Sequence, residues 1–333
     1  KLMTKILILG SNSFSGNHLA SFLIQKGYTI IGISKSTQNK DKYNPISDLT
    51  KNEKKKYIFN RCDINHEFIK LKKLILKHKP SIIIDFLGQG MVGESWIFPE
   101  LTFKSNLVSK VRLFEFLKDK NFLKKYVKIS TPEVFGSSAI KENKIDNYNP
   151  STPYALSHSS IETYLKLINK HYNFPIIISR FANFYGPFQK LYRVIPLVIH
   201  KAFNKEKFYL HGGGKSSRSF IHNKDFCNGI FKIVKTGKIG ETYHFSSKEY
   251  ISIEKLVQKI YLIFNLDPKK YIVNVKDRIG KDTNYKIYDQ KTKNKLNWGD
   301  KINLDEGIDS TIKWYLRYKK KFKTKETKFK IKL

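Results

Sequence analysis

The chain has few of the residues and patterns that mark secreted, metal-bound or membrane proteins. It holds only two cysteines in 333 residues, Cys62 and Cys227, and they lie too far apart for a disulfide framework or a cysteine metal site. No apolar run approaches the roughly 18 residues that a membrane-spanning helix needs. The sequence enters an apolar, strand-like run at Lys5 without a signal-peptide pattern. We therefore predict a cytoplasmic protein with no membrane span and no metal.

Acidic residues are also scarce, with 28 Asp and Glu against 63 Lys and Arg and a formal net charge of +35. Such an excess raises the question of a nucleic-acid partner. The lysines are spread over the whole chain, however, and do not form one stripe with aromatic residues between them. We predict no nucleic-acid binding, and an anionic small substrate would gain from the positive field. Only the tail from Arg317 is dense in lysine, and we expect it to be disordered or peripheral.

The first half of the chain alternates between strand-like and helix-like segments. Lys5–Leu9 is a continuous apolar run that stops at Gly10, and Tyr28–Ile33 is a second run after a helical segment at Asn17–Lys26. This alternation predicts an α/β fold with a doubly wound parallel (Rossmann) sheet, whose ligands bind at the carboxyl ends of the strands. The further strands are expected at 57–62, 82–87, 126–129 and 175–179, and the further helices at 67–78, 103–119 and 154–172.

The pattern changes beyond Gly186. Short segments punctuated by glycine and proline alternate with one expected helix near 252–264. We interpret this region as a smaller mixed α/β lobe that binds the substrate. The predicted parts are thus a dinucleotide-binding domain over 3–186, a substrate lobe over 187–316 and a basic tail over 317–333.

One stretch gathers acid–base groups. The strand predicted before Ser130 presents that hydroxyl together with Thr131 and Glu133, and a following helix carries Tyr154 and His158 four residues apart on one face. A hydroxyl, a phenol, a carboxylate and an imidazole would then meet at one strand end. This predicts a site for proton transfer.

The order of the motifs resembles the extended short-chain dehydrogenase/reductase family, in its nucleotide-sugar epimerase and dehydratase branch. The match runs from about Lys5 to Tyr315 and is most similar to dTDP-glucose 4,6-dehydratases. Its motifs are G-S-N-S-F-S-G, S-T-P-E-V-F-G, P-Y-A-L-S-H, R-F-A-N-F-Y-G-P, H-G-G-G-K-S-S-R-S-F-I-H-N-K-D-F, G-E-T-Y-H-F-S and D-R-I-G-K-D.

The resemblance implies a reaction through transient oxidation of the sugar at C4 by a nicotinamide. Tyr154 would take the proton of the C4 hydroxyl, Thr131 would bond the same hydroxyl, and Glu133 would remove the C5 proton before water leaves C6. The predicted enzyme is an NAD(P)-dependent nucleotide-sugar 4,6-dehydratase, a lyase that gives a 4-keto-6-deoxy sugar. The alternatives are a 4-epimerase, a 4-dehydrogenase or a decarboxylase on the same scaffold, or a catalytically weakened nucleotide-binding member.

Two positions depart from the family pattern at the reaction centre. His158 stands where the family's Y-x-x-x-K has its lysine, and a histidine with its ordinary pKa of about 6.5 is mostly neutral at pH 7. Proton abstraction by Tyr154 should then be weaker or depend differently on pH. Pro132 replaces the aspartate that protonates the departing C6 hydroxyl in dTDP-glucose dehydratases. Relatives acting on GDP-mannose have a serine there and still eliminate water.

Two further departures concern the cofactor. Ser13 occupies the middle glycine position of G-x-x-G-x-x-G, ahead of a helix whose free N–H groups suit a pyrophosphate. The second strand ends in Ser34-Lys35-Ser36 where NAD-preferring members carry an acid, and two hydroxyls with a cation suit a 2′-phosphate. We predict NADP, with NAD as the alternative. The expected cofactor contacts are Gly10, Asn12, Ser13, Phe14, Gly16, Ser34, Lys35, Asp63, Ile64, Leu87, Gly88, Ser130, Tyr154 and His158.

The resemblance also implies substrate contacts and an assembly. Asn183 is expected near the diphosphate, and Arg218 and Arg278 are expected as phosphate or ribose contacts because a guanidinium fork suits a diphosphate. Ser95 and Trp96 follow the fourth strand, and one of the two is expected to face the sugar; Ser95 is the predicted substrate contact. Family members commonly form homodimers through a four-helix bundle, here built from the helices at 103–119 and 154–172.

Overall fold

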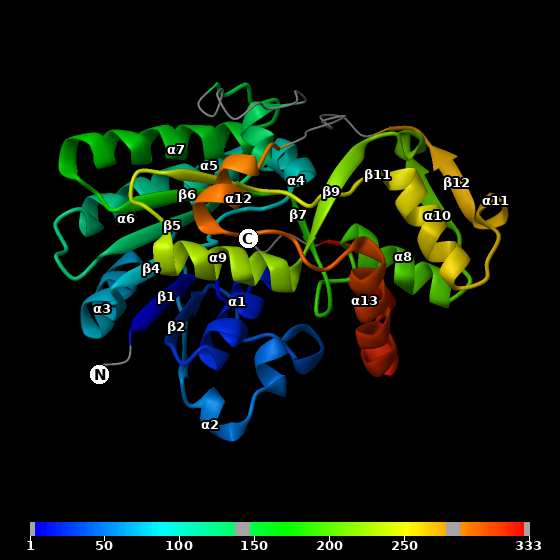
Figure 1. Ribbon diagram of the computed structural model, residues 1–333, viewed down its shortest axis with the longest axis horizontal. Coiled ribbons are helices and arrows are strands. Elements are labelled where there is room, and N and C mark those ends of the chain that lie inside the picture. The colour runs from blue at the N-terminus through cyan, green and yellow to red at the C-terminus, as the bar shows by residue number, and fades with distance from the viewer. Residues whose placement is uncertain (1–3, 137–146, 278–286, 330–333) are drawn as a thin grey trace.

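The computed structural model describes residues 4–136, 147–277 and 287–329, and its elements alternate between strand and helix over most of that length (Figure 1). The strands are β1 (Lys5–Leu9), β2 (Thr29–Ser34), β3 (Tyr57–Arg61), β4 (Ile82–Asp85), β5 (Lys125–Ser130), β6 (Ile176–Phe181), β7 (Asn183–Tyr185), β8 (Phe208–His211), β9 (Ser217–His222), β10 (Thr242–Phe245), β11 (Tyr250–Ser252) and β12 (Ile272–Val275). The α-helices are α1 (Phe14–Gln25), α2 (Lys51–Lys54), α3 (Phe68–His78), α4 (Val92–Ile97), α5 (Pro99–Phe103), α6 (Ser109–Leu117), α7 (Pro153–Tyr172), α8 (Val194–Phe203), α9 (Asn223–Thr236), α10 (Ile253–Ile263), α11 (Pro268–Tyr271), α12 (Gln290–Leu296) and α13 (Leu304–Tyr318).

The central sheet has seven parallel strands in the order β10-β6-β5-β4-β1-β2-β3. The chain starts at β1 in the middle, winds outward to β3 and then returns to build the other half. Side chains of alternate residues enter two apolar layers, which explains why the strands are apolar on both faces. The predicted doubly wound α/β fold is therefore confirmed, and the first strand occupies the expected Lys5–Leu9.

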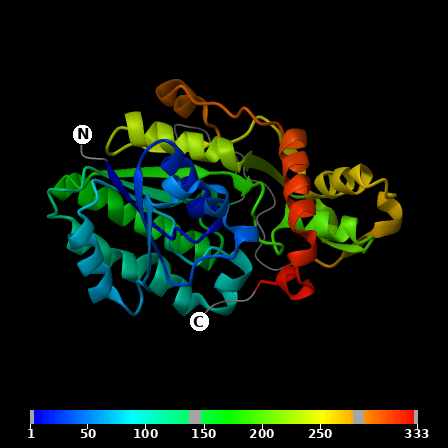
Figure 2. The same cartoon turned by 90° about the horizontal axis from the view of Figure 1, so that it is seen from below.

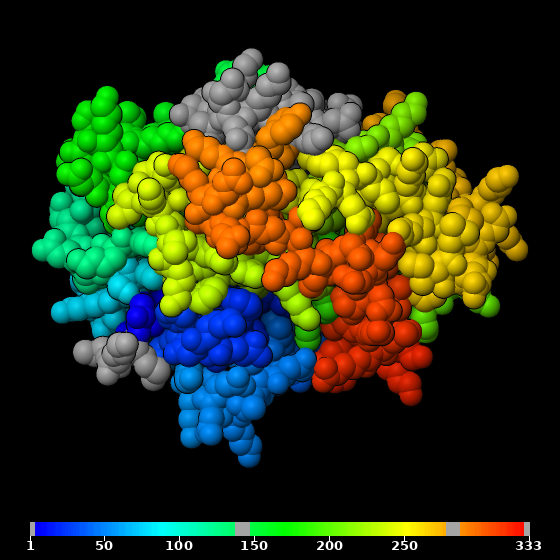
Figure 3. Space-filling view, in the orientation of Figure 1, coloured from blue at the N-terminus to red at the C-terminus, as the bar shows by residue number. Residues whose placement is uncertain are grey.

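Helices cover both faces of this sheet. One face packs against α1 and α9, and α12 lies on the same side, so segments far apart in sequence adjoin on one surface (Figure 3). The other face packs against α3, α6 and α7. Because all strands run in parallel, their carboxyl ends form a single edge, and that edge faces the second lobe.

The second lobe is built from two small sheets and several helices. β9 pairs in parallel with β7 and in antiparallel with β11, while β8 pairs with β12. Its core holds apolar side chains of α8, α10 and α13, so the expectation of one helix in this region is wrong. Figure 2 shows α13 between the central sheet and the helices α8 and α10.

The single domain boundary expected at residue 186 is too simple. The chain leaves the first domain after β6, but α9, β10 and α12 return to it, and β10 pairs with β6 along the whole of its length from Thr242 to Phe245. The two paired strands lie more than 60 residues apart in sequence, so local periodicity cannot predict that they are neighbours.

The described part of the basic tail makes defined contacts at the surface, so the expectation of disorder is wrong and that of a peripheral position stands. The ring of Phe322 stacks on Tyr315 with centroids 5.2 Å apart. The buried ammonium of Lys42 donates to the backbone oxygen of Lys321 at 2.7 Å and to the carboxylate of Glu326 at 2.6 Å. The tail is thereby attached to the segment that follows β2. Across the described residues, no helix is both long and apolar enough to span a membrane.

Candidate active site

The end of β5 brings three of the predicted groups together. Thr131 caps a single 3-10 turn over Pro132–Phe135, and its Oγ1 accepts the backbone N–H of Glu133 at 3.2 Å. The Thr131 hydroxyl also hydrogen-bonds the phenol of Tyr154, and Glu133 lies close enough to act electrostatically on that phenol. A hydroxyl, a carboxylate and a phenol therefore converge at the carboxyl edge of the sheet.

Tyr154 begins the long helix α7. Thr152 caps the helix by accepting the N–H of Ala155 at 3.1 Å, and Pro153 suits the first turn because its missing N–H would lack a partner there. Burial raises the pKa of the Tyr154 phenol, and the carboxylate of Glu133 adds to the rise. The hydrogen bond with Thr131 and the charge of Arg193 oppose it. In the structure as described, the phenol is thus protonated near neutral pH, and a base role requires further positive charge.

Proline at 132 contributes no side-chain donor to this site. It is buried at the first position of the 3-10 turn, where its fixed backbone angle suits the turn. Position 132 therefore offers no side-chain acid, as the sequence indicates.

The turn between β1 and α1 has the shape of a phosphate-binding loop. Gly10 has a φ of +78°, and a Cβ on Gly16 would lie 2.4 Å from the carbonyl oxygen of Gly10, so only glycine allows this close approach. Ser13 caps α1 by accepting the N–H of Gly16 at 3.0 Å. The serine that stands at the family's middle glycine position thus caps the helix. The N-terminus of this twelve-residue helix still suits a pyrophosphate.

Asn12 organises the loop after β2. Its N–H bonds the Ser34 hydroxyl at 2.9 Å and its amide donates to the Ser36 hydroxyl at 2.8 Å, while its Oδ1 accepts the N–H of Asn39 at 2.9 Å. The side chain of Lys35 between the two serines is exposed. Phe14, also expected near the cofactor, begins α1 and packs edge-on against the ring of His18.

Arg61 lies at the candidate cofactor site although it was not predicted from the sequence. It ends β3 directly beside Ser34 in the sheet, and its Nε donates to the backbone oxygen of Lys35 at 3.1 Å. The register of two parallel strands places it there, and only the structure supplies that register. Two cations, Lys35 and Arg61, therefore flank a loop without any acidic residue between Ser34 and Lys40.

The other cofactor positions lie along the same edge. Asp63 forms its own turn, because its carboxylate accepts the N–H of Asn65 at 2.8 Å, and Ile64 beside it is buried. The N–H of Leu87 bonds Asp85 at 2.9 Å, and Gly88 has a φ of +148°.

Asn106 is a second residue missed from sequence, and it joins the end of β4 to α7. It lies in a π-helical turn over Lys104–Val108, so the helix expected at 103–119 is interrupted. Its Oδ1 accepts the N–H of Gln89 at 2.7 Å and its amide donates to Ser157 at 3.0 Å. A buried asparagine inside an apolar helix was the available signal.

The expectation that Ser95 faces the sugar is wrong. Its side chain is fully buried, its hydroxyl donates to the backbone oxygen of Val92 at 2.6 Å, and its oxygen accepts the N–H of Tyr154 at 3.2 Å. Both hydrogen-bonding functions of the hydroxyl are used within the protein. Ser95 therefore anchors the first turn of α7, the turn that carries Tyr154.

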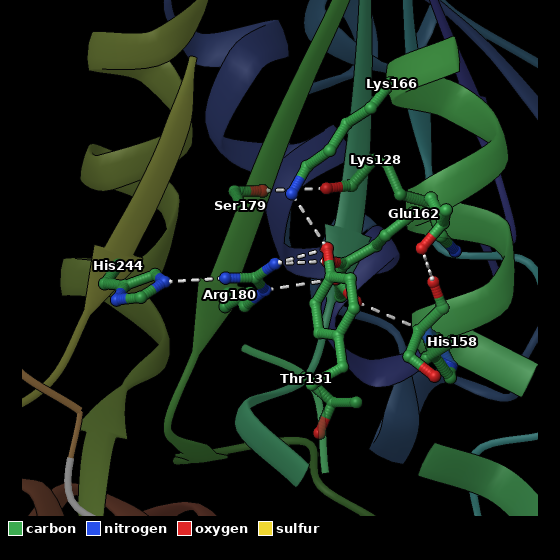
Figure 4. Close-up of polar contacts among 12 residues, drawn as sticks. Lys128, Thr131, His158, Glu162, Lys166, Ser179, Arg180 and His244 are labelled. Atoms are coloured by element: carbon green, nitrogen blue, oxygen red, sulfur yellow. Dashed lines mark hydrogen bonds and ion pairs between the residues drawn. The ribbon is translucent and has the colours of Figure 1, made fainter. Parts of the chain in front are cut away.

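Behind Tyr154, the imidazole of His158 joins a buried polar network (Figure 4). The rings of Tyr154 and His158 have centroids 4.6 Å apart, and Nδ1 of His158 lies 3.4 Å from the Ser130 hydroxyl. That hydroxyl also bonds Glu162 one turn further along α7. Glu162 in turn forms a buried ion pair with Arg180 of β6.

Glu162 is ionised in this network. Burial opposes ionisation, but the Arg180 guanidinium and hydrogen bonds from Arg180, Ser130 and Tyr148 outweigh burial and lower the pKa of Glu162 to about 2. The guanidinium also contacts His244 of β10 at 2.9 Å. Four elements, β5, β6, β10 and α7, are thus tied together beneath the candidate site.

A second buried cluster lies beside the first. Asp85 of β4 pairs with the ammonium of Lys110, and Lys128 of β5 lies 3.6 Å from its other oxygen. All three side chains are inaccessible to solvent or nearly so. Burial opposes the ionisation of Asp85, but the two ammonium groups lower its pKa to about 2.

The predicted substrate residues lie in or beside the second lobe. Asn183 begins β7, opposite Phe220 of β9, and Arg218 belongs to β9. The guanidinium of Arg218 donates to the backbone oxygen of Ser217 at 2.9 Å. Arg278 lies outside the described residues. The described residues contain no group of three His, Cys, Asp or Glu side chains arranged to hold a metal ion.

Comparisons with known proteins agree with this geometry. Residues 7–311 match the family described as GDP-mannose 4,6 dehydratase. The dTDP-glucose 4,6-dehydratase of Xanthomonas campestris pv. campestris is 26% identical over 94% of this chain and 93% of its own, and the human dTDP-D-glucose 4,6-dehydratase is 29% identical over 93% and 89%.

Solved structures give the same picture. The dTDP-glucose 4,6-dehydratase of Bacillus anthracis in complex with NAD superposes with a TM-score of 0.83, at 27% identity over 95% of this chain and 98% of that one. The UDP-glucose 4-epimerase of Thermotoga maritima has a TM-score of 0.84 at 23% identity, over 94% and 99%, and supports the fold alone.

Proposed function

Because the chain belongs to the GDP-mannose 4,6 dehydratase family, in the nucleotide-sugar branch of the short-chain dehydrogenases/reductases, we propose that it is a nucleotide-sugar 4,6-dehydratase. The reaction removes water from a nucleotide-linked hexose and leaves a 4-keto-6-deoxy sugar. The observation that carries the proposal is the convergence of Thr131, Glu133 and Tyr154 at the end of β5. An epimerase needs the phenol but has no use for a carboxylate that removes the C5 proton.

Each residue of the site has a role that its chemistry permits. Tyr154 takes the proton of the C4 hydroxyl, and Thr131 holds that hydroxyl and the phenol in register. When bound, a nicotinamide would supply the hydride acceptor for C4 and the hydride donor for C6. Glu133 removes the C5 proton, which the C4 carbonyl has made acidic, and water then leaves C6. Pro132 donates no proton to the departing hydroxyl, so that proton must come from another donor, either solvent or the Glu133 carboxyl once it has taken the C5 proton.

Product mass tests the proposed function directly. Incubation of the protein with nucleotide-linked hexoses and either nicotinamide dinucleotide should give a product lighter by one water, measured by mass spectrometry. A product of unchanged mass would indicate epimerisation, and the loss of two hydrogens would indicate net oxidation at C4. Either of these results would replace dehydration as the function.

For the cofactor, the residues fit a nicotinamide dinucleotide, and we propose that it is NADP. The Gly10–Gly16 turn and the N-terminus of α1 would hold the pyrophosphate, and the edge beyond β4 and β5 would hold the nicotinamide ribose near His158. The support for a 2′-phosphate is the acid-free Ser34–Ser36 loop with Lys35 and Arg61 beside it. The Bacillus anthracis relative was solved with NAD, so the choice depends on this loop.

Replacing Lys35 with alanine should weaken NADPH binding about tenfold and leave NADH binding nearly unchanged, because one charge-assisted contact to the 2′-phosphate is lost. Titration of nicotinamide fluorescence measures both affinities. Lys40→Ala is the matched control, since that exposed lysine lies in the same loop beyond the serines. Equal weakening of both cofactors, or a wild-type preference for NADH, would contradict the NADP proposal.

We also propose a homodimer in the cytoplasm. Leu156 and Leu167 of α7 and Val108 beside α6 are exposed apolar side chains on the helices expected to form a four-helix bundle. Multi-angle light scattering should then give twice the chain mass, and a monomer would refute the dimer.

Both cysteines are free and buried, which suits a reducing compartment, and cell fractionation would test the location.

A further inference from the structure

The segment over residues 39–48 continues from the loop after β2, which is part of the proposed cofactor site. It begins at Asn39, whose N–H donates to Oδ1 of Asn12 at 2.9 Å and whose side-chain amide donates to the backbone oxygen of Asn12 at 2.7 Å. Asn12 lies in the Gly10–Gly16 turn and also bonds two serine hydroxyls of the loop after β2. Two hydrogen bonds therefore fix the start of the segment to the phosphate-binding turn.

Four residues further on, the same segment enters the other lobe. Tyr43 is buried in the apolar core that α8, α10 and α13 form. The centroid of its ring lies 6.4 Å from that of Trp314 in α13 and 5.9 Å from that of Phe322 in the tail. Nε1 of Trp314 also donates to the backbone oxygen of Lys42 at 3.1 Å. A single 3-10 turn over Asp41–Tyr43 therefore joins the phosphate-binding turn to the second lobe.

The ammonium of Lys42 is buried at this junction, and residues of the tail bind it. It donates to Oε2 of Glu326 at 2.6 Å and to the backbone oxygen of Lys321 at 2.7 Å, and the Lys42 side chain is only 6% exposed. The same Oε2 accepts the N–H of Lys323 at 2.9 Å, so the carboxylate also fixes the turn of the tail. A buried ammonium that loses its carboxylate is strongly unfavourable. Without Glu326, the side chain of Lys42 would have to move toward water.

The substrate side of the molecule contacts the same elements. Phe329 of the tail packs edge-on against Tyr192, in the connection between β7 and α8. From this connection, the ammonium of Lys190 donates to Oδ1 of Asn39 at 3.2 Å and lies 3.7 Å from the centroid of the Tyr43 ring. The tail and the connection therefore both contact the 39–48 segment. The family match ends at residue 311, so the tail lies beyond it.

We propose that Glu326 and Lys42 are positioning residues for the cofactor. Their buried ion pair holds the 3-10 turn and, through Asn39, keeps the phosphate-binding turn and the loop after β2 in the conformation that binds a nicotinamide dinucleotide. The path is short, because the N–H of Tyr43 donates to the backbone oxygen of Lys40 at 2.8 Å and closes the turn directly after Asn39. The inference rests on the proposed cofactor site and does not depend on dehydration.

Glu326→Ala is the first test. The dissociation constants of NADPH and NADH, measured by titration of nicotinamide fluorescence, should each rise about tenfold. The turnover number at saturating cofactor should stay within about twofold of wild type, because the groups at the end of β5 are unchanged. Loss of a carboxylate makes the chain more positive, which on charge alone would favour the anionic cofactor. Weaker binding would therefore report the position of the loop.

Asp309→Ala is the matched control. It removes the same charge from α13, where the Asp309 carboxylate forms an exposed ion pair with Lys313 at 2.7 Å. Cofactor affinity should then stay within about twofold of wild type, because an exposed pair contributes little. Equal weakening in Asp309→Ala and Glu326→Ala would overturn the proposal, and so would wild-type affinity in folded Glu326→Ala.

Hydrogen exchange of the tail gives a readout that needs neither a substitution nor a reaction. Coupling is reciprocal, so a bound dinucleotide should in turn hold the tail in place. In the wild-type protein, saturating NADPH or NADH should slow exchange of the backbone N–H groups over 319–329 about tenfold, measured by mass spectrometry. If Glu326→Ala does not fold, this measurement decides, because unchanged exchange in the tail would overturn the proposal.

The same experiments separate this inference from the proposed function. A wild-type protein that binds a dinucleotide with protection of the tail, but dehydrates no nucleotide sugar, would refute the proposed function and keep the positioning role. Dehydration with undiminished cofactor affinity in Glu326→Ala would refute the positioning role alone. A protein that binds neither dinucleotide would refute both.

Discussion

Replacing Tyr154 with phenylalanine is expected to lower turnover by about 10²–10⁴-fold, the usual contribution of a positioned acid–base group. The change removes one oxygen from a residue that keeps some exposed surface, so the fold should survive. The hydroxyl hydrogen-bonds Thr131, and its loss leaves no proton acceptor for the C4 hydroxyl at the end of β5. Because C4 oxidation precedes every later step, reduction of the nicotinamide and formation of product should fall together.

Stopped-flow absorbance of the reduced nicotinamide and product mass measure these two quantities. Tyr164→Phe is the control, since Tyr164 lies on the same helix and bonds Glu115 at 2.6 Å on the outer side of the protein. If Tyr154→Phe retained more than about a tenth of wild-type turnover, the proton acceptor would have to be another group.

Activity of the wild-type protein should rise with pH until the base is fully ionised. Burial and the carboxylate of Glu133 both raise the pKa of the Tyr154 phenol. The ionised form, which is the active one, is therefore favoured at higher pH. His158 contributes no titration between pH 5 and 8, because its pKa is lowered to about 3. A single ascending limb is therefore expected over that range.

Local patterns predicted the elements that position this site. Apolar runs ending at Gly10 and Gly88 placed β1 and β4, and the turn at Gly10–Gly16 followed from residue types that a tight turn requires. Tyr154 and His158 were expected on one helical face, and their ring centroids are 4.6 Å apart. These features depend on spacing along one segment, which the sequence contains directly.

Contacts between segments could not be predicted in the same way. Lys128, Asp85 and Lys110 are charged residues inside apolar patterns, and each alone resembles an irregular strand or helix position. Only the register of β4 beside β5, with α6 packed above them, shows that they form one cluster. The burial of Ser95 likewise depends on how α4 meets the start of α7.

The two departures from the family pattern concern different steps of the proposed reaction. Pro132 limits one step, the protonation of the leaving hydroxyl, and this step can use solvent at the edge of the sheet. His158 concerns the earlier step, and its Nδ1 lies 3.4 Å from the Ser130 hydroxyl in a buried hydrogen-bond network. The step that neither change touches is removal of the C5 proton.

Replacing Glu133 with glutamine is therefore expected to stop dehydration while C4 oxidation continues. The amide has the shape of the carboxylate but cannot accept a proton, so the C5 proton stays in place and water does not leave C6. Exchange of the C5 proton with deuterium from the solvent should fall by at least about 10²-fold. The nicotinamide should still be reduced on addition of the nucleotide sugar, because Tyr154 and Thr131 are intact.

Two measurements distinguish the role of Glu133 from that of the other site residues. Mass spectrometry and proton resonance at C5 report exchange, and absorbance of the reduced nicotinamide reports C4 oxidation in the same sample. Loss of both signals would indicate damage to the site as a whole, while undiminished exchange in the glutamine variant would exclude Glu133 as the base. Since an epimerase passes through C4 oxidation without exchanging C5, loss of exchange with retained oxidation is the result that dehydration alone predicts.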